Sequence, residues 1–190
     1  MADIEGQVRE ERLDPEAEQR RRAALAHIRQ YSDPVLRLRA PEVVEFDDDL
    51  QTLVERMTVL MRDASGVGLA ANQVGVLRRV FVFAPGEDEE ARAVVNARIV
   101  ERSSELATDQ EGCLSLQGVR VPVERPVSVV LQGNDVDGSS LRLELTELAA
   151  RVAQHELDHL DGVLILDRTT DEARREALAT LRPRPVLDVR

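Results

Sequence analysis

Hydrophobic residues recur at intervals of three and four after Asp47-Asp48-Asp49. The apolar positions are Leu50, Leu53, Val54, Met57, Leu60 and Met61. This spacing places them on one face of an α-helix. We expect that helix to begin at the aspartates, which can cap its first turn, and to end near Ala64. A second helix is expected to open at Thr146-Glu147 and to end near Asp161-Gly162, where the glycine suits a C-terminal cap.

Runs of β-branched and alternating residues predict strands between these helices. The predicted strands cover residues 79–83, 94–99, 119–123, 127–131 and 141–145, with an acidic turn at 86–90 and a hairpin turn at 134–140. A polar helix is expected from Asp171 to about Leu181. The strands come as a group before one long helix and do not alternate with helices, so the order of elements favours an α+β fold over a parallel sheet.

Composition divides the 190 residues into three parts. Residues 1–26 mix acids and arginines with few large apolar side chains, so we expect a polar leader that is helical or disordered and stays outside the core. Residues 27–170 carry the periodic segments and are expected to form one catalytic domain. Residues 171–190 are expected to form a polar C-terminal helix and tail.

Charge and composition exclude several classes of function. The formal net charge is −11, which does not indicate a nucleic-acid or anionic-membrane partner. No apolar run approaches the roughly 18–20 residues of a membrane span, and residues 1–22 lack the apolar centre of a secretory signal. We therefore expect a cytoplasmic protein. Lysine is absent, which excludes lysine Schiff bases and phosphate-binding loops that require that residue.

The strongest chemical signal is the segment Gln154-His155-Glu156-Leu157-Asp158-His159 inside the second predicted helix. Residues four apart share a helical face, so both histidines can reach one metal ion, and Glu156 can act as general base on a water beside it. The alternative is that the histidines only pack and form hydrogen bonds. They share their face with Leu148 and Val152, however, and buried imidazoles need partners that a metal would supply.

Two histidines leave a metal short of a third ligand, for which three residues are candidates. His27 lies at the end of the leader. Glu172 would complete the two-His-one-Glu set of many zinc peptidases, although its surroundings are typical of a surface helix. Cys113, the single cysteine, follows Gly112, which allows close approach of the backbone. A lone cysteine is most often a small buried hydrophobe. The unpaired thiol could nevertheless supply the ligand that the two histidines leave missing, so Cys113 is preferred.

Three segments of the chain resemble the motifs of the peptide deformylase family, in the family's order. They are Gly66 to Gln73, Glu111 to Ser115 and Gln154 to His159, and the likeness extends from about Asp33 to Arg168. The resemblance implies antiparallel β-sheets around a central metal-binding helix. It also implies a hydrolase that removes the formyl group from the N-terminal formyl-methionine of newly made proteins, releasing formate.

The resemblance also implies roles for individual residues. Cys113, His155 and His159 become the metal ligands, and Glu156 the general base and acid. The family's usual metal is Fe(II), with Zn, Ni or Co as substitutes, and mixed thiolate and imidazole ligands suit Fe and Zn equally.

Donors to the oxyanion are implied at the side-chain amide of Gln73 and the backbone N–H of Leu114. The chain departs from the family pattern at Asn72 and Ala97, where Pro is common, and at Glu147, where Gly is usual. These departures concern the shape of the substrate groove more than the chemistry.

The expected substrates are the N-formylmethionyl ends of nascent chains. Val67 and Gly68 are expected to pair their backbone with the extended peptide as an added strand would. Leu148 and Val152 are candidates for the pocket of the methionine side chain.

Ribosome association is left open and a monomer is the default expectation. Two alternatives also stay open, a zinc endopeptidase that uses Glu172 as ligand and a non-enzymatic metal-binding relative.

Overall fold

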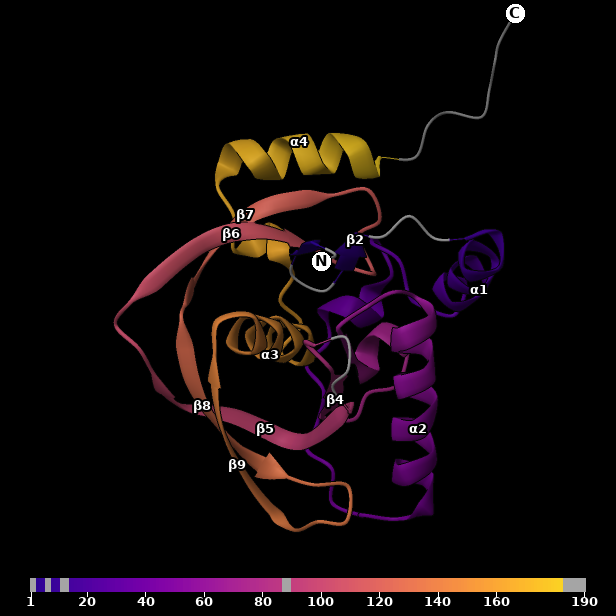
Figure 1. Ribbon diagram of the computed structural model, residues 1–190, viewed down its shortest axis with the longest axis vertical. Coiled ribbons are helices and arrows are strands. Elements are labelled where there is room, and N and C mark those ends of the chain that lie inside the picture. Colours follow the sequence, from indigo (N-terminus) through magenta and orange to yellow (C-terminus); the bar gives the residue numbers. More distant parts are fainter. Residues whose placement is uncertain (1–2, 6–7, 11–13, 87–89, 183–190) are drawn as a thin grey trace, which may run out of the picture.

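The computed structural model describes residues 3–5, 8–10, 14–86 and 90–182. Figure 1 shows helix α3 (Glu147–Leu160) in the middle of the molecule, with curved strands around it and helix α2 (Asp48–Asp63) along one side. Helix α4 (Asp171–Leu181) lies beside the ribbon formed by strands β6 (Leu106–Gly112) and β7 (Arg120–Pro126). Among the described residues, no helix combines the length and the apolar character that a membrane span needs.

Within the described residues, the largest sheet has five strands in the order β3-β4-β5-β8-β9, and every neighbouring pair is antiparallel. These strands are β3 (Gly68–Ala70), β4 (Val80–Phe83), β5 (Arg92–Arg102), β8 (Ser128–Asn134) and β9 (Ser140–Thr146). Strands β6 (Leu106–Gly112) and β7 (Arg120–Pro126) form a separate antiparallel ribbon. The antiparallel sheets and central helix confirm the expected α+β fold.

The two helices predicted from periodicity form where expected. The side chain of Asp47 accepts a hydrogen bond from the Leu50 N–H at 2.9 Å and so caps α2. Leu50, Met57 and Met61 of this helix are fully buried against the sheet. Helix α3 is buried at every position from residue 150 to residue 160, so its polar side chains must find partners inside the protein.

The entry and exit of α3 depend on backbone conformations that suit glycine. Gly162 follows the helix with φ of +74°, and a Cβ there would lie 2.6 Å from the carbonyl oxygen of Arg37. Glu147, the first residue of the helix, has φ of +50°. This left-handed conformation is costly for a residue with a side chain. It falls at the position where the resemblance leads one to expect glycine.

Within residues 27–170, strands β3 and β6 were not predicted, because neither carries the apolar pattern that is typical of a strand. Strand β3 has only three residues, two of them Gly and Ala. Strand β6 is exposed or half-buried along its first five residues and is held by its pairing with β7. Strand β5 runs from Arg92 to Arg102, beyond the predicted 94–99, through a polar and mostly exposed end. Periodicity detects strands with a regular apolar pattern, so it misses the three-residue β3 and the polar β6.

The remaining parts are short helical turns, a second ribbon and the leader helix. The 3₁₀ turns are η1 (Pro34–Arg37), η2 (Ala71–Val74) and η3 (Ile165–Asp167), and the second ribbon pairs β1 (Asp3–Glu5) with β2 (Val8–Glu10). Helix α1 (Pro15–Leu25) is mostly exposed, yet its Ala24 is buried in the core, which corrects the expectation that the leader stays outside. Part of the predicted turn at 86–90 and the tail after residue 182 lie outside the described residues.

Candidate metal centre

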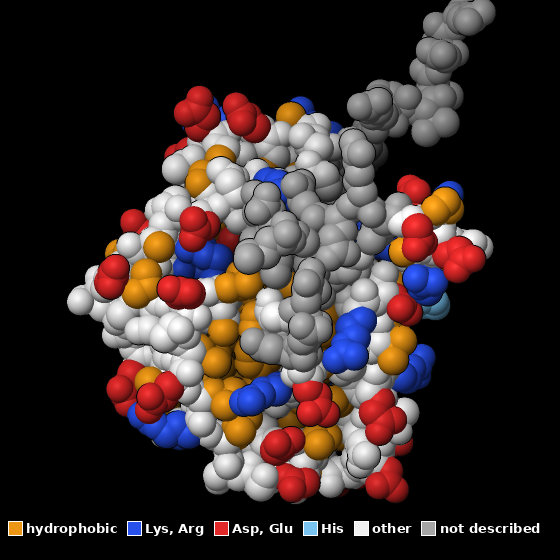
Figure 2. Space-filling model, viewed as in Figure 1, with side chains coloured by type: hydrophobic (Ala, Val, Ile, Leu, Met, Phe, Trp, Pro, Cys, Tyr) orange, Lys and Arg blue, Asp and Glu red, His pale blue; other side chains and the backbone are white. Residues whose placement is uncertain are grey.

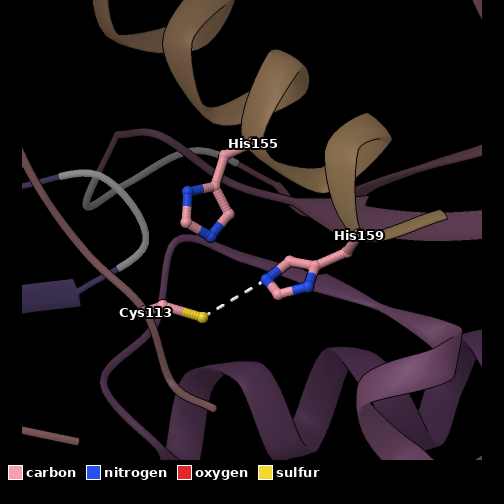
Figure 3. Close-up of side chains that lie close together, drawn as sticks. All are labelled: Cys113, His155 and His159. Atoms are coloured by element: carbon pink, nitrogen blue, oxygen red, sulfur yellow. Dashed lines mark hydrogen bonds between the residues drawn. The ribbon is translucent and has the colours of Figure 1, made fainter. Parts of the chain in front are cut away.

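Three buried side chains from two elements converge on one point (Figure 3). His155 and His159 project from neighbouring turns of α3, and Cys113 comes from the end of β6. Their candidate ligand atoms all lie within 4.8 Å of one another, and the Cys113 Sγ is 3.2 Å from the His159 Nε2. The helical spacing therefore brings the two histidines to one point, and the fold places Cys113, the preferred third candidate, beside them.

Glu111 determines which nitrogen of His155 faces this point. Its Oε2 lies 3.0 Å from the His155 Nδ1. Burial opposes the ionisation of Glu111, but hydrogen bonds from Arg125 and His155 outweigh burial and hold the pKa of its carboxyl well below the usual range. An ionised carboxylate only accepts, so the Nδ1 of His155 must donate. The Nε2 of His155 is left buried, and no hydrogen-bond partner for it is found among the described residues.

The protonation states of the other two side chains follow from burial. The pKa of His159 is well below its ordinary value, because burial and the neighbouring His155 disfavour its charged form. A neutral imidazole is the form that binds metals. Burial also raises the pKa of the Cys113 thiol, and the negative charge of Glu156 adds to this effect. Without a bound cation the thiol therefore keeps its proton at neutral pH, and a cation must displace it to bind.

A network of charged side chains surrounds Glu111 and links the ribbon to α3. Arg125 forms a two-pronged pair with Glu111, with N–O distances of 2.6 and 2.9 Å, and donates at 2.9 Å to Asp158 on α3. Arg151, also on α3, donates to Glu111 at 2.8 Å. Arg168 binds the same Asp158 through both of its carboxylate oxygens. Buried charges are tolerated when they are paired in this way.

Glu156 is fully buried on α3 and its carboxylate lies against the backbone of Gly68. A Cβ at Gly68 would come within 2.8 Å of the Glu156 carboxyl carbon and 2.9 Å of the Val152 Cγ1. Glycine is therefore required here for close approach and not for a special backbone angle. The general base that the motif predicts is thus in contact with the glycine-rich segment, at the edge strand of the main sheet.

Gln73 is held with its amide nitrogen toward Cys113. Its Oε1 accepts from the Ala70 N–H at 2.9 Å, while its Nε2 lies 3.0 Å from the Ser115 Oγ and 3.8 Å from the Cys113 Sγ. Leu114 follows Cys113 directly, is buried, and accepts a hydrogen bond from Gln30 through its carbonyl at 3.2 Å. Both residues expected to act as oxyanion donors therefore lie beside the cysteine.

Of the residues expected to bind substrate, Gly68 and Val152 lie close to the Glu156 carboxylate. Val67 and Val152 are fully buried and share one core region, and Leu148 is half-buried against it. Partly buried apolar side chains of the sheet continue this region: Ile99, Leu141, Leu143 and Leu145. Figure 2 shows apolar side chains gathered near the middle of the face seen in Figure 1, with charged side chains around them.

The structure does not bring the other two candidate ligands to this site. His27 is exposed and lies in the wall of an apolar hollow over α2. Glu172 is exposed in the first turn of α4. Among the described residues, the group of three that could hold a metal consists of Cys113, His155 and His159.

The sequence motifs contain Glu111 and Asp158, and Asn72 is a departure from them, but no role was predicted for these residues or for Arg125 and Arg151. The spacing of four residues places Arg151 on the helical face of His155, but this spacing alone does not indicate its partner. No local pattern pointed to Asn72, which is fully buried and whose amide nitrogen donates to the carbonyl of His159. This departure from the family pattern therefore holds η2 to the end of α3.

Comparisons with known proteins agree with the geometry. Residues 25–175 match the family model for polypeptide deformylase. The peptide deformylase 1 of Corynebacterium glutamicum is 45% identical over 161 residues, which cover 84% of this chain and 95% of the relative. Peptide deformylase 1 of Corynebacterium efficiens is 48% identical over 157 residues, or 82% of this chain and 93% of the relative.

Solved structures show the same likeness in three dimensions. A Plasmodium falciparum peptide deformylase in complex with an inhibitor matches with a TM-score of 0.75 at 36% identity, over 81% of this chain and 96% of that one. The Thermotoga maritima peptide deformylase matches with a TM-score of 0.73 at 44% identity, over 75% of this chain and 96% of that one.

The helix with its buried histidines and carboxylate, in an α+β frame shared with these structures, defines the class of protein as a hydrolase. The chain belongs to the polypeptide deformylase family, whose members remove the formyl group from the N-terminal formylmethionine of newly made proteins.

Proposed function

We propose that Cys113, His155 and His159 hold one divalent metal ion, with Fe(II) as the native metal and Zn, Ni or Co as substitutes. The observation that carries the proposal is the convergence of their ligand atoms within 4.8 Å. The residues also fit a metal chemically. A thiol and two imidazoles are ligand types of Fe and Zn sites, and the buried Nε2 of His155 has no other partner among the described residues.

Glu156 is the proposed general base and acid. When bound by these three residues, a divalent ion would lower the pKa of a water molecule and so supply a nucleophile near neutral pH. Glu156 takes the proton of the water as its oxygen adds to the formyl carbon. The same carboxyl then gives that proton to the departing amine, which releases formate and a free N-terminal methionine. Contact with Gly68 keeps the carboxylate in place for both transfers.

Gln73 and Leu114 are the proposed donors to the oxygen of the formyl group. Negative charge grows on this oxygen as the water adds, and donors held in place stabilise it without rearranging. The Gln73 amide is held by the Ala70 N–H and by Ser115, so its Nε2 keeps one orientation. Removing one such donor costs about 3 kcal/mol of activation free energy in comparable sites.

The peptide is proposed to bind along strand β3. This strand is at the edge of the five-stranded sheet, and an extended peptide can add to such an edge through backbone hydrogen bonds. Val67 and Gly68 then contact the peptide backbone, while Leu148 and Val152 face the methionine side chain. Because its substrate is the start of a nascent chain, we place the enzyme in the cytoplasm. Ribosome association and a monomeric state remain predictions for sedimentation and light-scattering measurements.

The test compares Glu156→Ala with the parent protein, both prepared anaerobically. Formate release from a formyl-Met peptide should fall by at least a factor of about 100, because general base catalysis contributes roughly that much or more. Metal content should stay near one ion per chain. A Glu156→Ala variant that remains fully active contradicts the role given to Glu156.

The ligand set has its own test. Cys113→Ala should lose bound metal, whereas Glu172→Ala, altered at an exposed position on α4, should keep it. A Cys113→Ala protein that retains one metal per chain would move the third ligand elsewhere. Loss of metal from Glu172→Ala would support an endopeptidase-like ligand set instead.

A further inference from the structure

Arg151 is the one arginine on α3, and it reaches across to the β6–β7 ribbon. It lies one turn before His155 and is buried. Its Nη1 donates to the Glu111 Oε1 at 2.8 Å and to the Val123 carbonyl at 2.9 Å. Its Nη2 donates to the Ala107 carbonyl at 2.8 Å. The guanidinium therefore joins the metal-binding helix to both strands of the ribbon.

The contacts of Arg151 on β6 follow the alternation of the strand. The side chains of Asp109 and Glu111, two residues apart, both bind Arg151, with Asp109 forming an ion pair at 3.0 Å, and Ala107 accepts through its backbone carbonyl. Alternate side chains point to one face of a strand. Arg151 thus lies over one face of β6 and fixes the position of that strand against α3. Cys113 follows this strand two residues after Glu111.

Glu111 is saturated with donors, two on each oxygen. Oε1 accepts from Arg151 and from the Arg125 Nε, and Oε2 accepts from the Arg125 Nη2 and from His155. Arg125 comes from the same ribbon as Glu111, so it fixes the carboxylate relative to the ribbon. Arg151 comes from α3, one turn from His155, so it fixes the carboxylate relative to the helix.

We propose that Arg151 is a positioning residue for the metal centre. By binding Glu111 and the ribbon backbone, it sets both the orientation of the His155 ring and the distance between Cys113 and the two histidines. It touches neither substrate nor reacting atoms. The inference rests on the ligand set proposed above. Side chains that orient metal ligands in this way are typically worth a factor of 10 to 100 in metal affinity.

The primary test is the Zn(II) dissociation constant, measured by competition with a chelator. Arg151→Met keeps the length of the side chain but loses every donor, so its dissociation constant should rise by a factor of about 10 to 100. Arg151→Lys keeps the charge but replaces a planar fork by one ammonium, which cannot reach Glu111 and both carbonyls together. Its dissociation constant should rise about threefold to tenfold, which places it between the parent and Arg151→Met.

A matched control separates the inner contacts of Arg151 from its outer ion pair. Asp109→Asn removes the charge of a side chain that is 65% exposed and leaves the contact between Arg151 and Glu111 intact. Its Zn(II) affinity should stay within about a factor of two of the parent, since exposed ion pairs contribute little. If Asp109→Asn loses as much Zn(II) affinity as Arg151→Met, the proposal that Arg151 acts on the metal centre through Glu111 is wrong.

A spectroscopic measurement reports on His155 directly. In the zinc-loaded protein, the ring-nitrogen NMR signals of His155 should show a proton on Nδ1 bound to Glu111, and its resonance should shift in Arg151→Met and partly return in Arg151→Lys. A role in general stability would lower the melting temperature of the metal-free protein but leave this resonance in place. Unchanged signals and unchanged Zn(II) affinity in a folded Arg151 variant would disprove the proposal.

If Arg151→Met does not fold, the Zn(II) affinity and NMR signals of Arg151→Lys, which retains the buried charge, decide whether the proposal holds. Failure of the proposed metal site is distinguishable. In that case the parent protein would bind no stoichiometric zinc, or Cys113→Ala would bind it as tightly as the parent, whatever the behaviour of the Arg151 variants.

Discussion

Gly68 and Glu156 are in direct contact, and the space between them has no room for a methyl group. One residue lies on the edge strand of the main sheet and the other in the middle of the central helix. The contact therefore fixes the carboxylate that we propose as general base against the strand that we propose as the binding surface for the peptide.

Gly68→Ala should keep the metal but lose activity. The added Cβ would push the Glu156 carboxylate away, and a shift of about 1 Å near reacting atoms can cost on the order of 100-fold in rate. Formate release and metal content measured on one sample check this. Gly118→Ala is the matched control, because Gly118 has nothing within 4 Å of an added Cβ and carries only the cost of its positive φ. Equal activities of the two variants would contradict the assignment.

Glu147→Gly should stabilise the protein. Glu147 holds φ of +50° at the start of α3, which costs a side-chain-bearing residue roughly 1–2 kcal/mol. Part of this gain is offset by the greater freedom of glycine in the unfolded chain. We expect the free energy of unfolding to rise by about 0.5–1 kcal/mol, measured by urea titration. Glu147→Ala retains a Cβ and should show no such gain; a gain of the same size there would assign the effect to the lost charge.

Metal affinity should increase with pH. The pKa of the Cys113 thiol is raised by burial, so below that pKa the metal-free protein carries a proton that binding must expel. The pKa of His159 is lowered, so this side chain is already neutral near pH 7 and releases no proton. The apparent affinity should therefore rise about tenfold per pH unit from pH 7 to 9. Zn(II) competition titrations across this range provide the measurement, and a flat profile would show that the thiol is not a ligand.

Removal of the metal should lower the stability of the folded protein. A ligand that binds only the native state adds about 4 kcal/mol at a free concentration of 1,000 times its dissociation constant. Calorimetry of the parent with and without a chelator should show a clear fall in melting temperature. Cys113→Ala should melt at the same temperature in both conditions, because it lacks one proposed ligand. A chelator effect of equal size in that variant would place the metal elsewhere.

The sequence predicted the parts of the fold that depend on buried, regularly spaced residues. Helix α2 was predicted from the spacing of its buried residues Leu50, Met57 and Met61. The histidine helix begins and ends where its capping residues indicated. Strand β6 gave no such signal, because its early residues are polar and exposed and its stability comes from pairing with β7. Pairing partners distant in sequence are not visible in a local pattern.

The candidate site was likewise predictable where its residues follow a local pattern, and not where they depend on contacts distant in sequence. The positions of His155, Glu156 and His159 follow from helical spacing, and the grouping with Cys113 was expected from the missing ligand and from a family likeness. The charges behind the site were not predicted. Arg151 reads locally as an ordinary helix arginine, and only the fold shows that it reaches Glu111, forty residues earlier in the chain. Long side chains that cross between elements have no periodic signature.

The separation of the β6–β7 ribbon from the five-stranded sheet has a consequence for how the protein matures. The two histidines come from one helix, but the thiol follows a ribbon that is joined to that helix by buried ion pairs of Arg125 with Asp158 and of Arg151 with Glu111. An intermediate with α3 formed and the ribbon undocked would offer two ligands and bind metal weakly. Tight metal uptake would then require the docked ribbon, so bound metal would report the chains in which the ribbon and α3 have come together.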